Sequence, residues 1–164
     1  MRSVVIASLA SSACVAPLQL SSGLAVSGGS VNPILEATAR MQEPVWIDRP
    51  QHEALWLGPT GSVELSPSDQ KAFVGAELLR SRLRNPRSPQ RTFDAFWIRP
   101  EIGWSSSTSG LQFYGGSVGI MRLVRGVPLT VAARGGSFRS GPDAGFYGTL
   151  TVGVVLSSPL YWMQ

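Results

Sequence analysis

The sequence contains one cysteine, Cys14, and one histidine, His52. A single cysteine cannot form a disulfide within the chain. Zinc sites built from cysteine and histidine need several such ligands, so sites of that class are excluded as well. We therefore expect the protein to hold no metal and no cofactor.

Acidic residues are missing from the beginning of the chain, where Glu36 is the first. Arg2 is followed there by a short apolar stretch and then by small residues, which is the order found in secretory signal peptides. The stretch is too short and too rich in serine to anchor the chain in a bilayer. We predict an export leader over residues 1–25, with an organelle transit peptide as the alternative. Cleavage before Cys14 would instead leave an amino-terminal cysteine open to lipidation.

Lysine is also scarce, because Lys71 is the only lysine among 14 basic residues. A bias toward arginine can arise from a GC-rich genome, and it also suits a surface that binds phosphate or carboxylate groups through paired hydrogen bonds. Because the chain is expected to be exported, anionic lipid headgroups or an acidic protein surface fit such a cluster better than nucleic acid does. The predicted anion or partner contacts are Arg80, Arg82, Arg84, Arg87 and Arg91.

Local signatures of catalysis are lacking too. A nucleophilic triad needs a serine on a shaped turn together with an oxyanion hole, and we find no segment that predicts both. The glycine pair at 115–116 lies inside an apparent strand with no lysine beside it, unlike a phosphate-binding loop that leads into a helix. We therefore predict no catalytic residue and a non-catalytic protein. An exported hydrolase that uses His52 is the enzymatic alternative.

The sequence is rich in glycine, with 18 residues, and in proline, with 12. Both favour strands and turns over a helical bundle. A chain of 164 residues that is 43% hydrophobic is long and apolar enough for one folded domain. We place a single β-rich domain at residues 52–164, preceded by a short helix and an extended linker at residues 26–51.

Two segments carry helix signals. Asn32 and Pro33 suit the cap and the first turn of a short helix. In the β-rich domain, apolar residues recur at three- or four-residue spacing after a capping Ser66, and three arginines follow at the expected carboxyl end. We predict a second helix over residues 66–84.

The remainder of the chain has the pattern of an antiparallel sheet, which we expect in residues 92–157. In the last strand, over residues 146–156, apolar side chains alternate with small or hydroxylated ones. The apolar side would meet the core of a soluble sandwich or the lipid around a membrane barrel, and the period of two is the same in both. Roughly four or five convincing strands follow residue 92, fewer than the roughly eight of a closed membrane barrel. The predicted fold is therefore mainly β with one or two helices (α+β), a small sandwich or partly open barrel, with a small outer-membrane β-barrel as the alternative.

Aromatic residues near the expected strand ends are candidate contacts, as in the aromatic girdles at membrane interfaces. We predict a structural or interaction protein of the cell envelope, in the periplasm or outer membrane. Its β domain would pack against a protein partner or a membrane surface, alone or as an oligomer. A barrel that serves as an anchor or a pore is the alternative. The predicted membrane or partner contacts are Trp97, Trp104, Tyr114, Tyr147 and Trp162.

Overall fold

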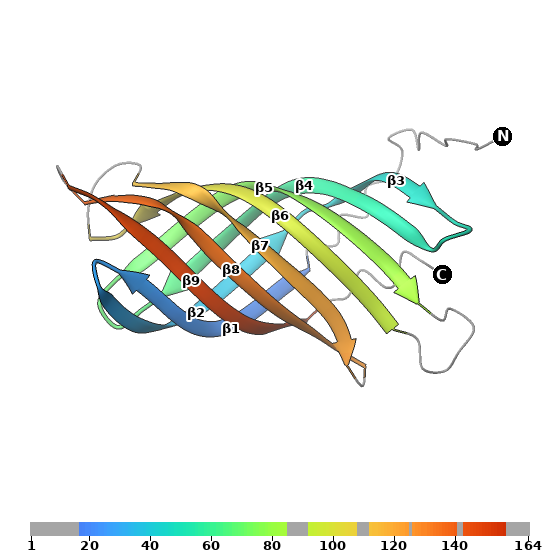
Figure 1. The fold of residues 1–164 in the computed structure, drawn as a ribbon, viewed down its shortest axis with the longest axis horizontal. Helices are drawn as coiled ribbons and strands as arrows, with labels where there is room; N and C mark the ends of the chain where they lie inside the picture. Colours follow the sequence, from blue (N-terminus) through green and yellow to red (C-terminus); the bar gives the residue numbers. More distant parts are fainter. Residues whose placement is uncertain (1–16, 85–91, 108–111, 125, 141–142, 157–164) are drawn as a thin grey trace.

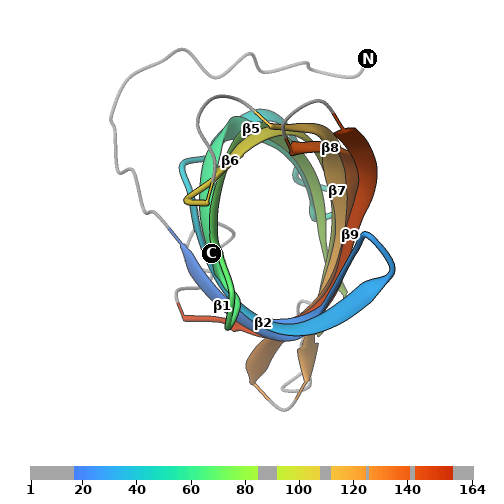
Figure 2. The same cartoon turned by 90° about the vertical axis from the view of Figure 1, so that its left-hand side faces the viewer.

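The protein folds into one antiparallel β-sheet that curls into a closed barrel (Figures 1 and 2). The computed structural model describes residues 17–84, 92–107, 112–124, 126–140 and 143–156. None of these residues lies in a helix. The strands in chain order are β1 (Leu18–Ser27), β2 (Ser30–Arg40), β3 (Glu43–Asp48), β4 (Glu53–Leu65), β5 (Gln70–Arg84), β6 (Thr92–Ser105), β7 (Phe113–Val124), β8 (Val127–Ser140) and β9 (Asp143–Val155).

The barrel closes because β1 pairs with β9 as well as with β2. The last part of β4 pairs with β2, and its first part pairs with β3, which continues the line of β2. Between the two pairings, the Met41 amide donates a hydrogen bond to the Pro59 carbonyl at 3.0 Å. The wall is thus an eight-strand up-and-down ring to which β3 adds an extension. Closure pairs the edges that an open sheet would leave unpaired.

The strands of the ring are staggered. We start at Ser27 of β1 and step from each residue to its pair partner on the next strand. One circuit of the barrel then returns to β1 at position 17, ten residues before the start. A stagger of this kind tilts the strands relative to the barrel axis, and Figure 1 shows their oblique course. The path passes through Tyr147, Gly136, Gly115, Glu101, Gly75, Thr60 and Arg40.

The two ends of the barrel are named here by their strands. The proximal end is the one at which β1 begins and β9 ends, and it also carries the β3–β4 and β7–β8 connections. The distal end carries the β1–β2, β4–β5, β6–β7 and β8–β9 connections.

The β1–β2 hairpin shows how a turn sets the register. Gly28 and Gly29 form its two-residue loop, with φ of 55° and 82°. Positive φ at both central positions is the type I′ turn, whose twist matches that of the strands, and glycine adopts it at little cost. The turn places Ser27 opposite Ser30, which fixes the pairing along the whole of β1.

Alternation along each strand gives the barrel two different faces. In β5, Phe73, Glu77 and Leu79 point into the barrel and are at most 1% exposed, whereas Val74 and Leu78 point outward and are 44% and 37% exposed. Neighbouring residues of a strand lie on opposite sides of the sheet, so this pattern follows directly from the strand geometry. The inward face contains charged residues, and the outward face is largely apolar.

The predicted helix over residues 66–84 is wrong, because Gln70–Arg84 is strand β5. The inward set of β5 mixes Phe73 and Leu79 with Glu77 and Ser81, and the outward set mixes valine and leucine with arginine. Because neither alternate set is uniformly apolar, the period of two that defines a strand could not be recognised from the hydrophobicity of the sequence. The mixed set is what a charged barrel interior requires.

The short helix predicted in residues 26–51 is also wrong. Asn32 and Pro33 lie inside β2, and the expected linker around Pro44 is strand β3. The predicted leader, residues 1–25, overlaps β1, so cleavage after Ala25 would remove most of a wall strand. Residues 1–16, which include Cys14, lie outside the described part of the chain.

The predicted antiparallel sheet in the last third of the chain is confirmed by β6 to β9, but it is part of a larger closed sheet. Pro100 does not divide β6, because the β6–β7 ladder runs through it without a break. The β5–β6 ladder omits the pairs at Arg99 and Pro100 and resumes on either side of them. A proline has no N–H to donate, so the strand continues with a local gap in its pairing. The α+β prediction is therefore replaced by its barrel alternative.

Candidate functional site

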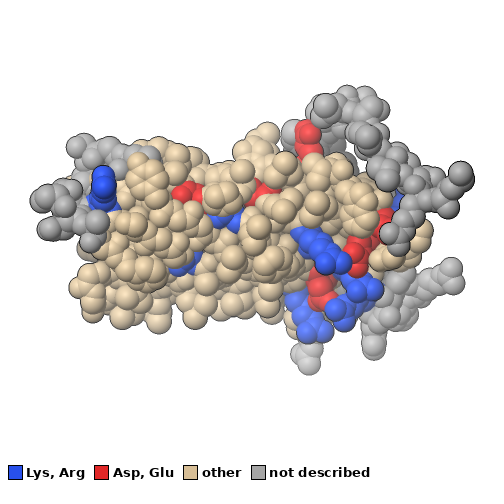
Figure 3. Space-filling model, turned by 45° about the horizontal axis from the view of Figure 1, so that its top comes forward, with Lys and Arg blue, Asp and Glu red and all other residues tan. Residues whose placement is uncertain are grey.

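The outward face of the barrel is an apolar belt. Along β6 the outward positions from Phe96 to Trp104 are Phe96, Ile98, Pro100, Ile102 and Trp104, and none of them is charged. The same holds for the outward positions of the other wall strands between the two barrel ends, in the part that the structure describes. Figure 3 shows a mostly uncharged surface with a few separate charged areas across its middle, and a larger cluster of charged side chains toward one end. Exposed members of the belt include Leu20, Leu24, Leu35, Val63, Val74, Ile98, Val118, Ile120, Val131, Leu150 and Val152.

The centre of the lumen is occupied by Arg134 of β8, whose side chain is 2% exposed. Its guanidinium donates to Glu36 Oε1 at 2.9 Å and to Glu101 Oε2 at 2.9 Å, and it lies 3.4 Å from Glu64 Oε2. Ser62 Oγ accepts a further hydrogen bond at 3.0 Å. These partners come from β2, β4 and β6, so one arginine ties four strands together across the lumen.

A second set of ion pairs is centred on Glu77 of β5. Arg99 of β6 donates to Glu77 Oε2 at 2.8 Å and to Glu101 Oε1 at 3.1 Å. Arg40 Nε lies 3.3 Å from Glu77 Oε1 as an ion pair without hydrogen-bond geometry, and Arg40 also donates to Gln19. Because Glu101 contacts both Arg99 and Arg134, the two sets form one network.

Each carboxylate of this network has a cationic neighbour. Glu36, Glu77 and Glu101 are paired with Arg40, Arg99 and Arg134, and Glu64 lies 3.4 Å from Arg134 Nη1. Lys71 Nζ lies 3.8 Å from Glu64 Oε1 and 3.0 Å from Asp69 Oδ2. The Tyr147 hydroxyl also donates to Glu64. A buried charge without a partner is strongly unfavourable, so each of these groups depends on the others.

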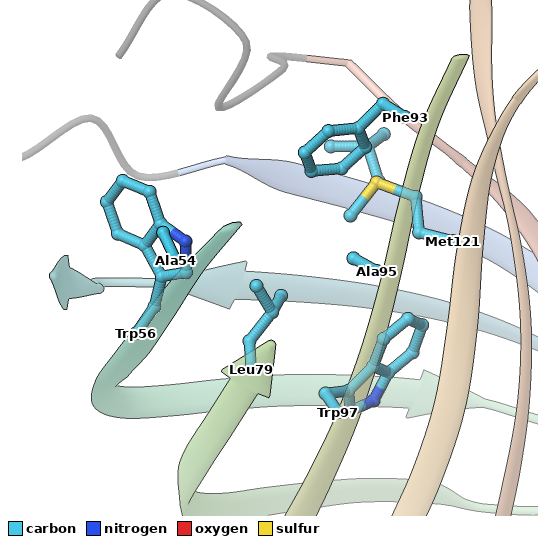
Figure 4. Close-up of a cluster of buried hydrophobic side chains, with 8 residues drawn as sticks. Ala54, Trp56, Leu79, Phe93, Ala95, Trp97 and Met121 are labelled. Carbon is cyan, nitrogen blue, oxygen red and sulfur yellow. The ribbon is translucent and has the colours of Figure 1, made fainter. Parts of the chain in front are cut away.

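Apolar side chains close the lumen on both sides of the network. Toward the distal end, Phe73, Phe113 and Tyr147 form an aromatic cluster, with ring centroids 5.3 Å apart for the first two and 5.9 Å for the last two. The proximal cluster is larger and is drawn in Figure 4. Its buried members are Ala54, Trp56, Leu79, Phe93, Ala95, Trp97, Met121 and Val155.

Glycines make room for these rings in the narrow lumen. Gly119 pairs across the strands with Trp97, and a Cβ on Gly119 would lie 2.1 Å from Trp97 Cζ2. A Cβ on Gly103 would lie 2.5 Å from Phe73 Cδ1. The ring of an inward aromatic residue therefore lies over a glycine of the neighbouring strand, where no other residue fits.

Little free space remains between the charged network and the wall. A void of about 10 Å³ lies there, bordered among others by Glu36, Arg99, Ser117 and Arg134. A cavity of that size has room for about one water molecule. The described part of the lumen thus holds buried charged side chains at its centre and buried apolar clusters on both sides of them.

At the distal end, Asp69 joins the β4–β5 turn to the end of β6. Ser105 Oγ donates to Asp69 Oδ2 at 2.6 Å, and Lys71 Nζ lies 3.0 Å from the same oxygen. Burial acts to raise the pKa of the Asp69 carboxyl, but the hydrogen bonds from Ser105 and Lys71 outweigh it and lower that pKa overall. Asp69 therefore remains ionised and holds two distal connections together.

Three of the predicted anion contacts, Arg80, Arg82 and Arg84, lie on the outward side of β5 at the proximal end, with side chains 65%, 53% and 58% exposed. The structure adds Arg122 of β7, which sequence reasoning did not single out, beside the same group. Arg87 and Arg91 lie outside the described residues.

The predicted aromatic contacts divide between the two faces. Trp104 and Tyr114 point outward and are 37% and 53% exposed. Trp97 and Tyr147 point into the lumen and are at most 1% exposed, so they are not available to a lipid or a partner. The odd-numbered positions of β6 and β9 face inward, and this register was not evident from aromatic content alone. Trp162 lies outside the described residues.

Within the described residues, the structure forms neither a catalytic triad around His52 or Ser117 nor a metal site. His52 lies in the turn before β4 with φ of 52°, and within the described residues its side chain makes no hydrogen bond to a serine or a carboxylate. Ser117 has glycines two residues away on each side, as in a nucleophile elbow, but it lies within β7 and is buried. The described residues hold no group of three or more side chains suited to bind a metal ion.

The charged lumen residues were missed by sequence reasoning. Their signal is a charged residue in the middle of a strand with a small or aromatic residue two positions away on at least one side, as at Glu77 after Gly75, Arg99 after Trp97 and Arg134 between Ala132 and Gly136. Such a residue can face water or a partner charge of opposite sign, and a single strand does not distinguish the two. Only the closed ring brings the opposite charges together.

No helix in the described part of the chain has both the length and the apolar character needed to cross a membrane.

Comparisons with known proteins give little. No family model matches the chain. No curated protein matches it either. Among solved structures, the crystal structure of Neisserial surface protein A (NspA) is similar with a TM-score of 0.45 and 10% sequence identity, over 85% of this chain and 94% of that one. A likeness at that level is too low to carry an inference about this chain.

Proposed function

We propose that the protein is an integral outer-membrane β-barrel that serves as a structural anchor with a closed lumen. The observation that carries the proposal is the distribution of polarity between the two faces of one closed sheet. A soluble barrel buries its apolar side chains inside and exposes polar ones. Here the charged residues are buried inside, and an uncharged apolar belt faces outward.

The dimensions of the belt support a membrane location. A transmembrane β-strand needs about 9–11 residues when tilted. The outward apolar run of β6, from Phe96 to Trp104, spans nine positions, and Trp104 and Tyr114 stand near its distal border. Charged outward residues such as Arg122 and Asp94 come directly after the run at its proximal border. Transmembrane barrels flank their apolar band with aromatic residues at both interfaces. Here Trp104 and Tyr114 lie at the distal border, and Phe96 lies at the proximal border.

The packed lumen favours an anchor over a pore. An eight-strand barrel has an interior just wide enough for side chains to fill it. Here the Arg134 network fills the centre, and aromatic clusters lie on both sides of it. The predicted export leader and the predicted protein partner both stay predictions, and the predicted cleavage after Ala25 falls inside β1.

Reconstitution tests both parts of this proposal. The purified protein is refolded into phosphatidylcholine vesicles, and insertion is followed by flotation and by a heat-dependent shift in gel migration. We expect flotation, a migration shift on boiling, and no steady ion conductance in a planar bilayer. A protein that stays in solution without detergent would contradict the membrane barrel, and a steady conductance from inserted protein would contradict the closed lumen.

A further inference from the structure

We propose that a row of charges at the proximal border of the apolar belt is a binding site for the headgroup of an anionic phospholipid. The inference rests on the proposed membrane location and extends it to one class of lipid. The row consists of Glu53, Arg82, Asp94 and Arg122, which are direct pair partners across β4, β5, β6 and β7. Arg80 and Arg84 flank it on β5.

Each carboxylate of the row is held between two arginines. Glu53 accepts from Arg80 at 2.8 Å and lies 3.3 Å from Arg82 Nε. Asp94 lies 2.8 Å from Arg84 Nε and 3.6 Å from Arg122 Nε. Asp48 of β3 continues the row as the pair partner of Glu53. Four arginines against three carboxylates leave the patch with an excess of one positive charge.

The free hydrogen-bond donors of the row point to an anion. Arg82, Arg84 and Arg122 contact their carboxylates through Nε, and among the described residues no hydrogen bond from their terminal Nη groups is found. Their side chains are 53%, 58% and 68% exposed. A guanidinium offers its paired donors to phosphate oxygens with matched geometry, so the carboxylates position the arginines while the Nη groups remain available.

The surroundings of the row favour a lipid over a free anion. On the same outward face, Leu78, Phe96 and Ile120 lie two residues from Arg80, Asp94 and Arg122 respectively, toward the middle of the barrel. They are 37%, 50% and 55% exposed and belong to the apolar belt. A ligand that fills both surfaces has an anionic head and apolar tails. Figure 3 shows this charged group beside the uncharged surface.

Lipid retention tests the site. The protein is inserted into vesicles of phosphatidylcholine mixed with phosphatidylglycerol and then extracted in a mild detergent, and the phospholipids bound per barrel are counted by mass spectrometry. We compare the wild type with the double variant Arg82→Gln/Arg122→Gln. The matched control is Arg49→Gln/Arg139→Gln, which removes the same charge from two exposed arginines. Arg139 lies on β8 at the distal end, and Arg49 lies in the β3–β4 turn beside the row.

We expect the row variant to lose the preference for phosphatidylglycerol over phosphatidylcholine by about tenfold, because basic side chains near an anionic surface bind its lipids additively. The control should keep that preference. Equal retention of phosphatidylglycerol in all three proteins would overturn the lipid site. An acidic protein surface would then be the candidate partner of the row. If inorganic phosphate displaces more bound lipid than chloride does at the same ionic strength, the site binds a free anion and the assignment to a lipid headgroup is wrong. Flotation with pure phosphatidylcholine vesicles separates these outcomes from a failure of the membrane proposal, since it does not depend on the row.

Discussion

Individual residues in the lumen depend on partners from strands that are far apart in the chain. Glu36 and Arg134 are separated by 98 positions, and their side chains are 7% and 2% exposed. Truncating one member of such a buried pair leaves the other charge without compensation. The Arg122–Asp94 pair of the proximal row is solvated, with side chains 68% and 31% exposed, and pairs of that kind contribute little to stability.

Replacement of Arg134 by methionine tests this difference. Arg134→Met leaves three glutamates without their common partner, and we expect the free energy of unfolding to fall by about 3–5 kcal/mol. Arg122→Met removes the same charge from the outer surface and should cost under about 1 kcal/mol. Denaturant unfolding of the refolded barrel measures both. Equal losses would contradict the central role of Arg134.

Gly119 tests the packing of the lumen. A valine at this position would collide with Trp97, because the added Cβ alone would lie 2.1 Å from the ring. We expect Gly119→Val to destabilise the barrel by about 1–3 kcal/mol, as overpacking does. Gly61→Val on β4 is the control, since the nearest atom to its added Cβ is 3.9 Å away. If both variants unfold at the same denaturant concentration as the wild type, the interior is looser than described.

Single strands carry different amounts of information about the fold. The alternation of β9 could be predicted from the sequence. Its inward residues Tyr147, Thr149 and Thr151 all carry a hydroxyl group, and its outward residues Leu150 and Val152 are aliphatic. The alternation of β5 could not be predicted in the same way. Its inward residues are apolar where the strand passes the apolar clusters and charged where it passes the centre of the lumen. A strand that contributes to an apolar cap and to a charged centre has no uniform face.

The outward face of β5 provides the test at the scale of an element. Val74 lies in the middle of the belt and Gln70 lies at its distal edge, and both point outward from the same strand. An arginine in the middle of a lipid-facing strand costs about 2–4 kcal/mol, and near the interface about 0–1 kcal/mol. We therefore expect Val74→Arg to be much more destabilising in vesicles than Gln70→Arg. Similar values for the two variants would contradict a lipid-facing belt.

At the scale of the whole molecule, the sequence supports a β-rich exported protein but leaves the closure of the sheet open. Counting strands after residue 92 gives too few for a ring, because four wall strands precede that residue. Of these, β1 was interpreted as part of a leader, and β2 and β5 were interpreted as helices. Closure depends on the β1–β9 pairing, which joins residues about as far apart as the chain allows. Local propensities contain no information about such a contact. Of the candidate contacts, Trp104, Tyr114 and the arginines of β5 lie on the outer face, while Trp97 and Tyr147 form part of the lumen.

The central claim is that adjacent residues of one strand face lipid and lumen, and positions 96 and 97 of β6 test it at the same depth. In a protein whose other tryptophans are changed to phenylalanine, one variant keeps Trp97, and the second carries Phe96→Trp with Trp97→Phe. Phospholipids with brominated acyl chains quench tryptophan fluorescence on contact. Once both variants are shown to insert, we predict strong quenching at position 96, which is 50% exposed, and little at position 97, which is fully buried. Equal quenching at the two positions, or stronger quenching at 97, would contradict the account.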